Sequence, residues 1–333
     1  MTEQRNKLKV GLIGLGKISK DRHLPFYLKN KDVDLVGVCD INPEKFKDLD
    51  ILGFTDYKDL LKQGLDVVDI ATPPFDHVEQ CLDCLKEGCN IIVEKPFTFT
   101  LKGCDKILDF ALKIGKKVCV FHSSLFFPVL MDAKKNLGCL GDIKLVRLKY
   151  NISKANHVLC NDWILKMPYG ALDEQIPHVA YIFNEFMRPD VAKVISDSRR
   201  NNYLIILEDH SNDISGSIDL HYGDDWVFQL EIIGSEKKAF IDILNQNFSI
   251  MDLKEDISKR SIFRDNISPL KNSLKSLFKI MGYSSKPYGH EYIINEFVNS
   301  IINGSDPPVS FMDIREVVRI TSLITKCVKQ DMS

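Results

Sequence analysis

Two side chains of this sequence stand where they could do chemistry on a hydroxyl group. Lys95 lies in Glu94-Lys95-Pro96, directly after an apolar run, and His178 follows a carboxylate, Glu174, by four residues. A free imidazole titrates at about pH 6.5 and a free lysine amine at about pH 10.4, so histidine suits proton exchange and a charged lysine suits holding the oxygen. Together, side chains of these two types could exchange the proton of a hydroxyl group and hold its oxygen. A solvated lysine at a strand end and a histidine packed in a core remain the alternatives.

A second group of residues has the spacing of a phosphate-binding turn, and it is the run Gly14-Leu15-Gly16-Lys17-Ile18-Ser19. This run follows an apolar segment and opens an amphipathic one, which is the setting that a dinucleotide fingerprint needs. Two glycines let the backbone approach a pyrophosphate, and the free N–H groups of a helix start attract it. Ser19 replaces the third glycine of the fingerprint but is small enough for close packing of helix on strand. Taken alone, the glycines fit a plain loop equally well.

Asp40 favours the phosphate-binding interpretation. It ends the second apolar run about twenty residues after the glycines, where a carboxylate accepts the ribose hydroxyls of NAD and repels the 2′-phosphate of NADP. No arginine follows it in the stretch DINPEK. We therefore predict a dinucleotide site that prefers NAD. The predicted cofactor-binding residues are Gly14, Gly16, Lys17, Ile18, Asp40, Thr72, Pro73, His77, Glu94 and Lys95.

Three members of this set lie in one turn and the segment after it. Thr72 and Pro73 are expected to wall the cofactor through their backbone. His77 follows Pro74 by three residues at an expected helix start, where a capping or packing role is the stronger interpretation.

Short apolar runs alternate with amphipathic segments over the first 121 residues. The strand-like runs are KVGLIG, VDLVGVCD, DVVDIAT, CNIIVE and KKVCVF. The helix-like segments are Lys17–Leu28, Pro43–Asp48, Tyr57–Gln63, Phe75–Glu87 and Leu101–Ile114. Such alternation predicts a parallel sheet with helices on both faces, the doubly wound Rossmann architecture. Lys95 would then follow the fourth strand, at the carboxyl edge where such sheets bind ligands.

After Phe121 several strand-like segments follow one another with few helices between them. They are Ile143–Ile152, Val191–Ser196, Tyr203–Asp209, Ile214–Tyr222, Trp226–Ile233 and Ala239–Leu244. Consecutive strands predict an α+β domain with an open, mostly antiparallel sheet. Residues 252–286 are polar and weakly periodic, and they give no structural prediction. Two amphipathic helices, about His290–Ile302 and Met312–Lys329, follow them.

These elements predict two domains. Residues 1–121 would bind NAD, and residues 122–333 would bind substrate and form the contacts of an oligomer, with C-terminal helices able to pack back on the first domain. Within the second domain Pro177 predicts a helix start, because proline is tolerated in a first turn. Glu174 would then lie just ahead of that helix and His178 on its first turn.

Composition excludes several classes of protein. The chain has 333 residues, 44% of them hydrophobic, with 44 Lys+Arg against 46 Asp+Glu and a net charge of −2. This balance gives no electrostatic basis for binding nucleic acid or membrane. The nine cysteines and the absence of an export signal predict reduced thiols in the cytoplasm. Cys81, Cys84 and Cys89 lack a second Cys-x-x-Cys or a nearby histidine, so no metal site is predicted.

The chain resembles the Gfo/Idh/MocA oxidoreductases, named for glucose-fructose oxidoreductase and inositol dehydrogenase, on three stretches. Ala71–Pro96 runs from a Thr-Pro turn through a histidine and a glycine to Glu-Lys-Pro, the most specific block. Gly170–His178, GALDEQIPH, is similar to the family's glycine-rich stretch ending in Asp-x-Gly-x-His. PPVSFMDIREVVRI looks like its C-terminal helix signature. The resemblance thus spans nearly the whole chain.

The resemblance implies roles for individual residues. In the family the lysine and histidine of these motifs face the nicotinamide, which makes Lys95 and His178 the catalytic residues, with Glu174 in place of the family's aspartate. Ile176 stands where the family has glycine, and Ser123 and Leu125 stand where it has asparagine and arginine. These departures bear on the substrate more than on the cofactor. The predicted substrate-binding residues are Lys95, His122, Trp163, Glu174 and His178.

The resemblance also implies the reaction. We expect NAD-dependent hydride transfer between nicotinamide and a secondary alcohol or ketone of a sugar, polyol or nucleotide sugar. A homodimer or homotetramer is expected, because apolar strands such as WVFQLEII outnumber the helices that could cover them. One alternative is a non-catalytic NAD-binding sensor or scaffold, which would need Asp40 and the glycines but neither Lys95 nor His178. Imine reduction and NAD-assisted elimination on a sugar are the others.

Overall fold

The computed structural model of the protein describes residues 7–153, 162–197, 202–253 and 289–331. Internal contacts divide the chain into two compact units. Unit 1 is Met1–Ser123 with His290–Arg319, and unit 2 is Ser124–Gly289 with Ile320–Ser333. Most of the segment 252–286 lies outside the described residues. The functional division at residues 121 and 122 stays a prediction.

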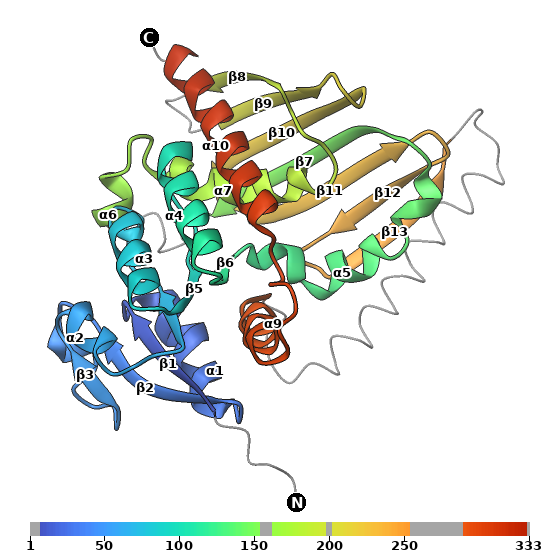
Figure 1. The fold of residues 1–333 in the computed structure, drawn as a ribbon. Coiled ribbons are helices and arrows are strands. Elements are labelled where there is room, and N and C mark those ends of the chain that lie inside the picture. The colour runs from blue at the N-terminus through green and yellow to red at the C-terminus, as the bar shows by residue number, and fades with distance from the viewer. Residues whose placement is uncertain (1–6, 154–161, 198–201, 254–288, 332–333) are drawn as a thin grey trace, which may run out of the picture. The chain divides into compact units, whose positions relative to one another are not determined.

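Unit 1 is built on a six-stranded sheet in which every pair of neighbouring strands is parallel (Figure 1). The strands are β1 (Leu8–Ile13), β2 (Val33–Cys39), β3 (Leu52–Phe54), β4 (Val67–Ile70), β5 (Asn90–Val93) and β6 (Val118–Val120). Their spatial order is β3-β2-β1-β4-β5-β6, the Rossmann order. The predicted parallel sheet is therefore confirmed.

Strand β3 was not predicted, and its presence corrects one position. Its three residues, Leu-Gly-Phe, are too short and too interrupted by glycine to give a β pattern, and β3 forms only the edge of the sheet. Lys95 therefore follows the fifth strand along the chain, not the fourth. It still lies at the carboxyl edge of the sheet.

The helices of unit 1 confirm the predicted segments. They are η1 (Ser19–His23), α1 (Leu24–Lys29), η2 (Pro43–Lys45), α2 (Tyr57–Leu61), α3 (His77–Lys86), α4 (Leu101–Lys113) and α9 (Gly289–Asn303), the last from His290 on. The helix after β1 begins at residue 17, and η1 within it is a π-helix. Side-chain caps fix two starts: Asp56 accepts from Lys58 N at 2.9 Å, and Thr100 Oγ1 accepts from Gly103 N at 3.1 Å.

The C-terminal segment is tied to unit 1 by polar contacts. Lys117 Nζ donates to the carbonyl oxygen of Ser300, near the end of α9, at 2.9 Å. The first part of α10 (Phe311–Asp331) adds an ion pair between Arg315 Nε and Asp105 Oδ1 at 2.7 Å. From residue 320 on, α10 belongs to unit 2.

Unit 2 is built on a seven-stranded sheet of order β13-β12-β11-β7-β10-β9-β8 (Figure 1). The strands are β7 (Ile143–Ser153), β8 (Val191–Asp197), β9 (Asn202–Asp209), β10 (Ile214–Gly223), β11 (Val227–Gly234), β12 (Lys237–Asp242) and β13 (Asn247–Asp252). Only β7 and β10 pair in parallel, so the predicted mostly antiparallel sheet is confirmed. The helical elements that begin in this unit are α5 (Pro128–Lys134), η4 (Leu137–Leu140), α6 (Asp162–Leu165) and α7 (Ala171–Asn184), and η3 (Ser123–Phe126) opens it.

The predicted start of α7 at Pro177 is wrong. The helix begins at Ala171, after Gly170, whose φ of 56° glycine adopts without steric cost. Asp173 in the first turn accepts the N–H of Tyr169 at 2.7 Å, which fixes this earlier start. Pro177 cannot donate to the carbonyl of Asp173, and the almost wholly buried helix tolerates that loss. Glu174 and His178 therefore lie within the helix, one turn apart.

Candidate functional site

The glycine turn after β1 has a backbone that only glycine suits. Gly14 has a φ of +93°, and its N–H donates to the carbonyl of Cys39 at 2.8 Å. A Cβ at this position would lie 2.6 Å from the carbonyl oxygen of Ala71. A Cβ on Gly16, by contrast, would meet nothing within 4 Å. The first glycine is required by the fold, whereas the second leaves open space.

Three segments of the predicted site follow neighbouring strands. The turn at Gly14 follows β1, Thr72 follows β4 and Lys95 follows β5, and these strands are adjacent in the sheet. Ala71 N donates to Ile13 O at 2.7 Å, which joins the first two segments directly. The strand order changes direction between β1 and β4, and ligands of doubly wound sheets bind at that point. Unit 1 thus places the predicted cofactor segments at one edge.

Asp40 is bonded to the glycine turn itself. Its Oδ2 accepts the N–H of Leu15 at 2.8 Å, and its Oδ1 accepts the N–H of Asn42 at 3.0 Å. Lys45 Nζ lies 2.8 Å from Oδ2. Burial acts to raise the pKa of Asp40, but the bonds from Lys45, Asn42 and Leu15 outweigh it and lower the pKa below its usual value. Asp40 is therefore ionised at neutral pH.

The start of the following helix fits a phosphate group. Ser19 is 0% exposed, and its Oγ has no hydrogen-bond partner among the described residues. A buried hydroxyl of this kind is costly without a partner. Beside the open space at Gly16 and the free N–H groups of a helix start, it suits the pyrophosphate of a dinucleotide. Ile18 lies at this start, and Lys17 is exposed and pairs with Asp21 at 2.9 Å.

His77 packs between two loops, as its position in the sequence favours. Its Nε2 lies 2.9 Å from the carbonyl oxygen of Thr72, and its Nδ1 lies 3.0 Å from that of Pro96. Burial lowers the pKa of this imidazole, although the backbone bonds act to raise it. Thr72 Oγ1 donates to Gln80 Oε1 at 2.6 Å, and Pro73 is half-buried beside it. His77 therefore holds the Thr72 turn against the loop that carries Lys95.

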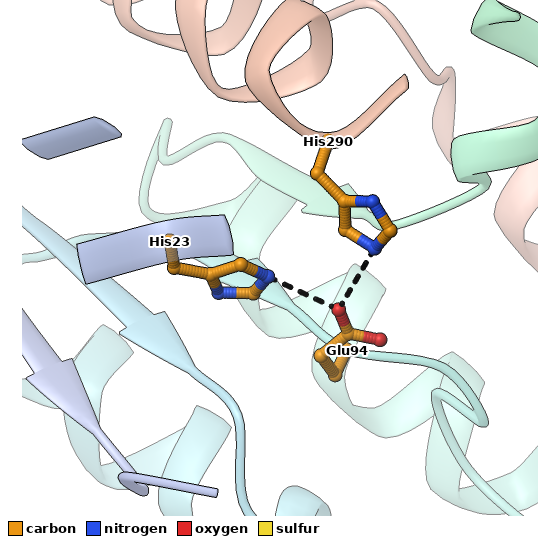
Figure 2. A group of neighbouring side chains, drawn as sticks. All are labelled: His23, Glu94 and His290. Carbon is orange, nitrogen blue, oxygen red and sulfur yellow. Dashed lines mark ion pairs between the residues drawn. The ribbon is translucent and has the colours of Figure 1, made fainter. Parts of the chain in front are cut away.

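Lys95 and Glu94 differ in where their side chains lie. Lys95 is half-buried, and its backbone N–H donates to Glu94 Oε2 at 3.1 Å. The Glu94 side chain is buried, and its Oε1 faces His23 and His290 (Figure 2). The assignment of both residues to cofactor binding stays a prediction. The contacts of Glu94 nevertheless place its buried carboxylate next to two imidazole rings.

In unit 2, His178 belongs to a chain of hydrogen bonds. Its Nδ1 lies 2.6 Å from Tyr181 Oη, and the Tyr181 hydroxyl donates to Ser124 Oγ at 2.7 Å. Each of the two hydroxyls can donate or accept in this chain. Where Tyr181 gives its proton to Ser124 Oγ, His178 Nδ1–H donates to Tyr181 Oη, and Nε2 is then the basic nitrogen that a general base requires.

Glu174 lies among polar aromatic side chains. It is buried, and it accepts a hydrogen bond from Gln175, whose Oε1 in turn accepts from Tyr150 Oη at 2.7 Å. Burial raises the pKa of Tyr150, and the charge of Glu174 raises it further. Burial and the same carboxylate also raise the pKa of Tyr222. These tyrosines therefore stay protonated and can donate hydrogen bonds.

The two remaining predicted substrate residues lie in different units. Trp163 is half-buried in α6 of unit 2. His122, in unit 1, is 2% exposed, and burial lowers its pKa to about 3, against the smaller opposing effect of Asp313. His122 is therefore a neutral buried imidazole at physiological pH. Its contact with substrate stays a prediction, as does that of Trp163.

Sequence reasoning missed three partners in these groups. The sequence contains no arginine directly after Asp40, but Lys45, five residues after Asp40, can pair with that carboxylate equally well. Tyr181 lies three residues after His178 on the helix, a spacing that could have signalled contact. Ser124 gave no signal, because its contact with Tyr181 joins distant parts of the sequence.

The cysteines carry no sign of special chemistry. The eight cysteines in the described part of the chain are free, and most of them are buried. Burial raises the pKa of the Cys81 and Cys84 thiols, and it raises that of Cys89 to about 11. They behave as small core side chains. Among the described helices, none combines the length and apolar character needed to cross a bilayer.

A protein-family model matches the first part of the chain. Residues 8–122 match the model of Gfo/Idh/MocA, an oxidoreductase family with an NAD-binding Rossmann fold. Over these residues, about a third of the chain, the sequence is similar to that family. The match covers the glycine turn, Asp40, the Thr72 turn and the loop that carries Lys95, all described above in unit 1.

Curated proteins match the chain over a limited region. Over 146 residues it is 32% identical to the D-glucoside 3-dehydrogenase of Escherichia coli K12, a match covering 41% of each protein. Over 144 residues it is 36% identical to the inositol 2-dehydrogenase/D-chiro-inositol 3-dehydrogenase of Lactiplantibacillus plantarum, covering 40% of this chain and 41% of that one. The chain thus spans about two fifths of the length of these curated relatives.

Solved structures extend the likeness to nearly the whole chain, at the level of fold. The UDP-N-acetylglucosamine 3-dehydrogenase of Acidithiobacillus ferrooxidans superposes with a TM-score of 0.77 at 15% identity, covering 98% of this chain and 100% of that one. The WlbA dehydrogenase of Bordetella pertussis, in complex with NADH and UDP-GlcNAcA, gives 0.77 at 17% identity, covering 98% and 96%. The fold is therefore shared with these two dehydrogenase structures.

Proposed function

We propose that this protein is an NAD-dependent dehydrogenase or reductase acting on a secondary alcohol or ketone of a sugar, polyol or nucleotide sugar. The observation that carries the proposal is the position of Lys95, which follows β5 at the same carboxyl edge of the sheet as the glycine turn and Asp40. The names of the relatives, which include glucoside, inositol and UDP-N-acetylglucosamine dehydrogenases, support the substrate class.

The chemistry divides between the cofactor and two side chains. Bound NAD supplies the hydride acceptor. In this proposal His178 Nε2 would take the hydroxyl proton of the substrate while the nicotinamide would accept the hydride from the carbinol carbon. The ammonium group of Lys95 stabilises the oxygen while negative charge develops on it. A hydrogen bond donated by His178 Nδ1–H to Tyr181 Oη would leave Nε2 free to accept that proton.

The rival proposal is a non-catalytic NAD-binding sensor. Mass spectrometry of ligands that co-purify, followed by a screen of sugars and nucleotide sugars for NADH absorbance, separates the two. Turnover of any of these compounds supports the dehydrogenase. Tight NAD binding without turnover across the screen supports the sensor. A product of elimination or of imine reduction would show that the protein is an enzyme but that it acts on a bond other than the one proposed.

Replacement of Asp40 by serine is expected to narrow a preference for NAD over NADP. The ionised carboxylate bonded to Leu15 N–H would accept a ribose hydroxyl and repel a 2′-phosphate. Lys45 offsets part of that repulsion, so Lys45→Ala is expected to widen the preference. Fluorescence titration of each variant with NADH and NADPH measures the ratio. Equal affinity of the wild type for both cofactors would contradict the proposal.

We also infer self-association through the outer face of the unit 2 sheet. Ile195 and Leu204 pair directly in register on β8 and β9 and are 64% and 42% exposed. Light scattering at micromolar concentration is expected to show a dimer or tetramer, and Leu204→Lys is expected to shift it toward monomer. A monomeric wild type would contradict this inference.

The free cysteines additionally favour a reducing compartment, the cytoplasm.

A further inference from the structure

Three side chains from distant parts of the sequence meet inside unit 1 (Figure 2). His23 ends the π-helix after the glycine turn, Glu94 follows β5, and His290 is the second residue of α9. Glu94 Oε1 lies 3.2 Å from His23 Nε2 and 3.5 Å from His290 Nε2. The three side chains are 0%, 8% and 11% exposed. The group is thus a nearly closed set of two imidazoles and one carboxylate.

The atoms that face one another here lack ordinary hydrogen bonds. Among the described residues, His23 Nε2 and Glu94 Oε1 are buried and neither makes a hydrogen bond, although they are neighbours. Buried polar atoms of native proteins are nearly always bonded. A ring nitrogen at this distance makes no hydrogen bond when its N–H direction does not point at the oxygen. Both atoms could instead bind a third atom that lies between them.

The spacing of these atoms fits a coordinated metal ion. Zinc binds histidine nitrogen and carboxylate oxygen at about 2.0–2.2 Å, so neighbouring ligand atoms of a tetrahedral site lie about 3.4 Å apart. The two measured separations from Glu94 Oε1, 3.2 and 3.5 Å, match this value. All three ligand atoms lie within 4.8 Å of one another. Little movement would be needed to bind an ion.

The surroundings of His23 are those of a metal ligand. Its Nδ1 lies 3.0 Å from Asp69 Oδ2, and Tyr27 Oη donates to the same carboxylate oxygen at 2.8 Å. Metal-binding histidines commonly give their second N–H to a carboxylate in this way, which leaves the other nitrogen for the metal. Phe121 stacks on the His23 ring with centroids 4.4 Å apart and fixes its plane.

The charges around the group also suit a cation. Asp69 and Glu94 each place a carboxylate against the His23 ring, on Nδ1 and on Nε2, and both carboxylates are buried. A divalent ion held by two neutral imidazoles would balance these two carboxylates.

We propose that His23, Glu94 and His290 form a binding site for Zn²⁺, with a water molecule as the fourth ligand. Two histidines and one glutamate are a ligand set that zinc uses in proteins. An ion there would join α9 to the helix of the glycine turn and to the loop that carries Lys95. The proposal is independent of the dehydrogenase function, because none of its observations involves a substrate. The sequence alone does not indicate this site, because its three ligands have no characteristic spacing.

The test measures zinc on the full chain, purified without a histidine tag. We expect elemental analysis of the dialysed wild type to give about one zinc per chain. His290→Gln should lower zinc affinity by about a hundredfold or more, because it removes a direct ligand. His210→Gln is the matched control, since His210 is 63% exposed and pairs with Asp190. After chelator treatment, added zinc should raise the unfolding temperature of the wild type and of His210→Gln, but not that of His290→Gln.

Two results would overturn the proposal. In the first, the wild type retains no zinc and added zinc leaves its unfolding temperature unchanged, so the group is a plain ion-pair network. In the second, His290→Gln binds zinc as tightly as the wild type, so the ion sits elsewhere. Cobalt substitution of the wild type checks the site independently of how any variant folds. Tetrahedral absorption bands support the proposal, and spectra of hexaaqua cobalt alone contradict it.

Discussion

Replacement of Lys95 by alanine is expected to lower turnover by a factor on the order of a hundred or more, with NAD affinity changed only severalfold. The ammonium group of Lys95 would stabilise the substrate oxygen only as charge develops on it, so its loss should affect the rate more than cofactor binding. His178→Ala is expected to have an effect of similar size, because it removes the proton acceptor. NADH fluorescence titration beside steady-state kinetics, on the substrate that the screen yields, measures both quantities.

Matched controls separate this effect from a general loss of fold. Lys102→Ala removes an exposed lysine of α4, and His210→Ala removes an exposed histidine of unit 2, and both variants should keep normal turnover. If Lys95→Ala and His178→Ala also keep near-normal turnover, the catalytic assignment is wrong. If both lose NAD binding, these residues build the fold or the cofactor site instead.

The pH profile decides which residue carries the proton. We expect His178→Ala to remove the acidic limb of the profile, because neutral imidazole is the form that accepts a proton. The hydrogen bonds of His178 with Tyr181 and of Tyr181 with Ser124 are compatible with this assignment, because a proton on Nδ1 that is donated to Tyr181 leaves Nε2 basic. Should the acidic limb survive His178→Ala while Lys95→Ala abolishes turnover, lysine is the proton carrier.

Local patterns were sufficient to predict most of unit 1. The glycine turn, Asp40 and the Glu-Lys-Pro loop each lie at the end of a buried strand, and strand ends follow from short apolar runs. The strand that was missed in unit 1, β3, contributes three edge residues that include glycine and bury little. In unit 2 the edge strand β13 was missed as well. The absence of β3 from the prediction shifted the count of strands before Lys95 without changing the edge on which Lys95 lies.

Contacts between distant residues could not be predicted. Pro177 indicates a helix start by local rules, yet Gly170 and Asp173 begin α7 two turns earlier, and burial of the helix stabilises it. The grouping of His23, Glu94 and His290 depends on how the C-terminal segment packs in unit 1. No spacing within the sequence encodes such packing, whereas a sheet edge is encoded by each strand separately.

Replacement of Gly14 by alanine is expected to destabilise unit 1 and to abolish NAD binding. An L-residue at the φ of +93° pays a conformational cost of about 1–2 kcal/mol. The added Cβ would also lie 2.6–2.9 Å from backbone atoms of Ala71 and Thr72, and such overpacking costs about 1–3 kcal/mol. Gly64→Ala is the matched control, because Gly64 has a φ of +68° and open space around its Cβ. It should show the conformational cost alone.

Gly16→Ala completes this prediction by separating stability from binding. A Cβ on Gly16 meets nothing within 4 Å, so the midpoint of urea unfolding should stay close to that of the wild type. The same Cβ would occupy space that the pyrophosphate of NAD needs, so NADH affinity should fall at least about tenfold. If Gly16→Ala binds NADH as tightly as the wild type, the cofactor does not approach this turn. If Gly14→Ala is no less stable than Gly64→Ala, the Ala71 backbone can move aside and the contact does not limit the fold.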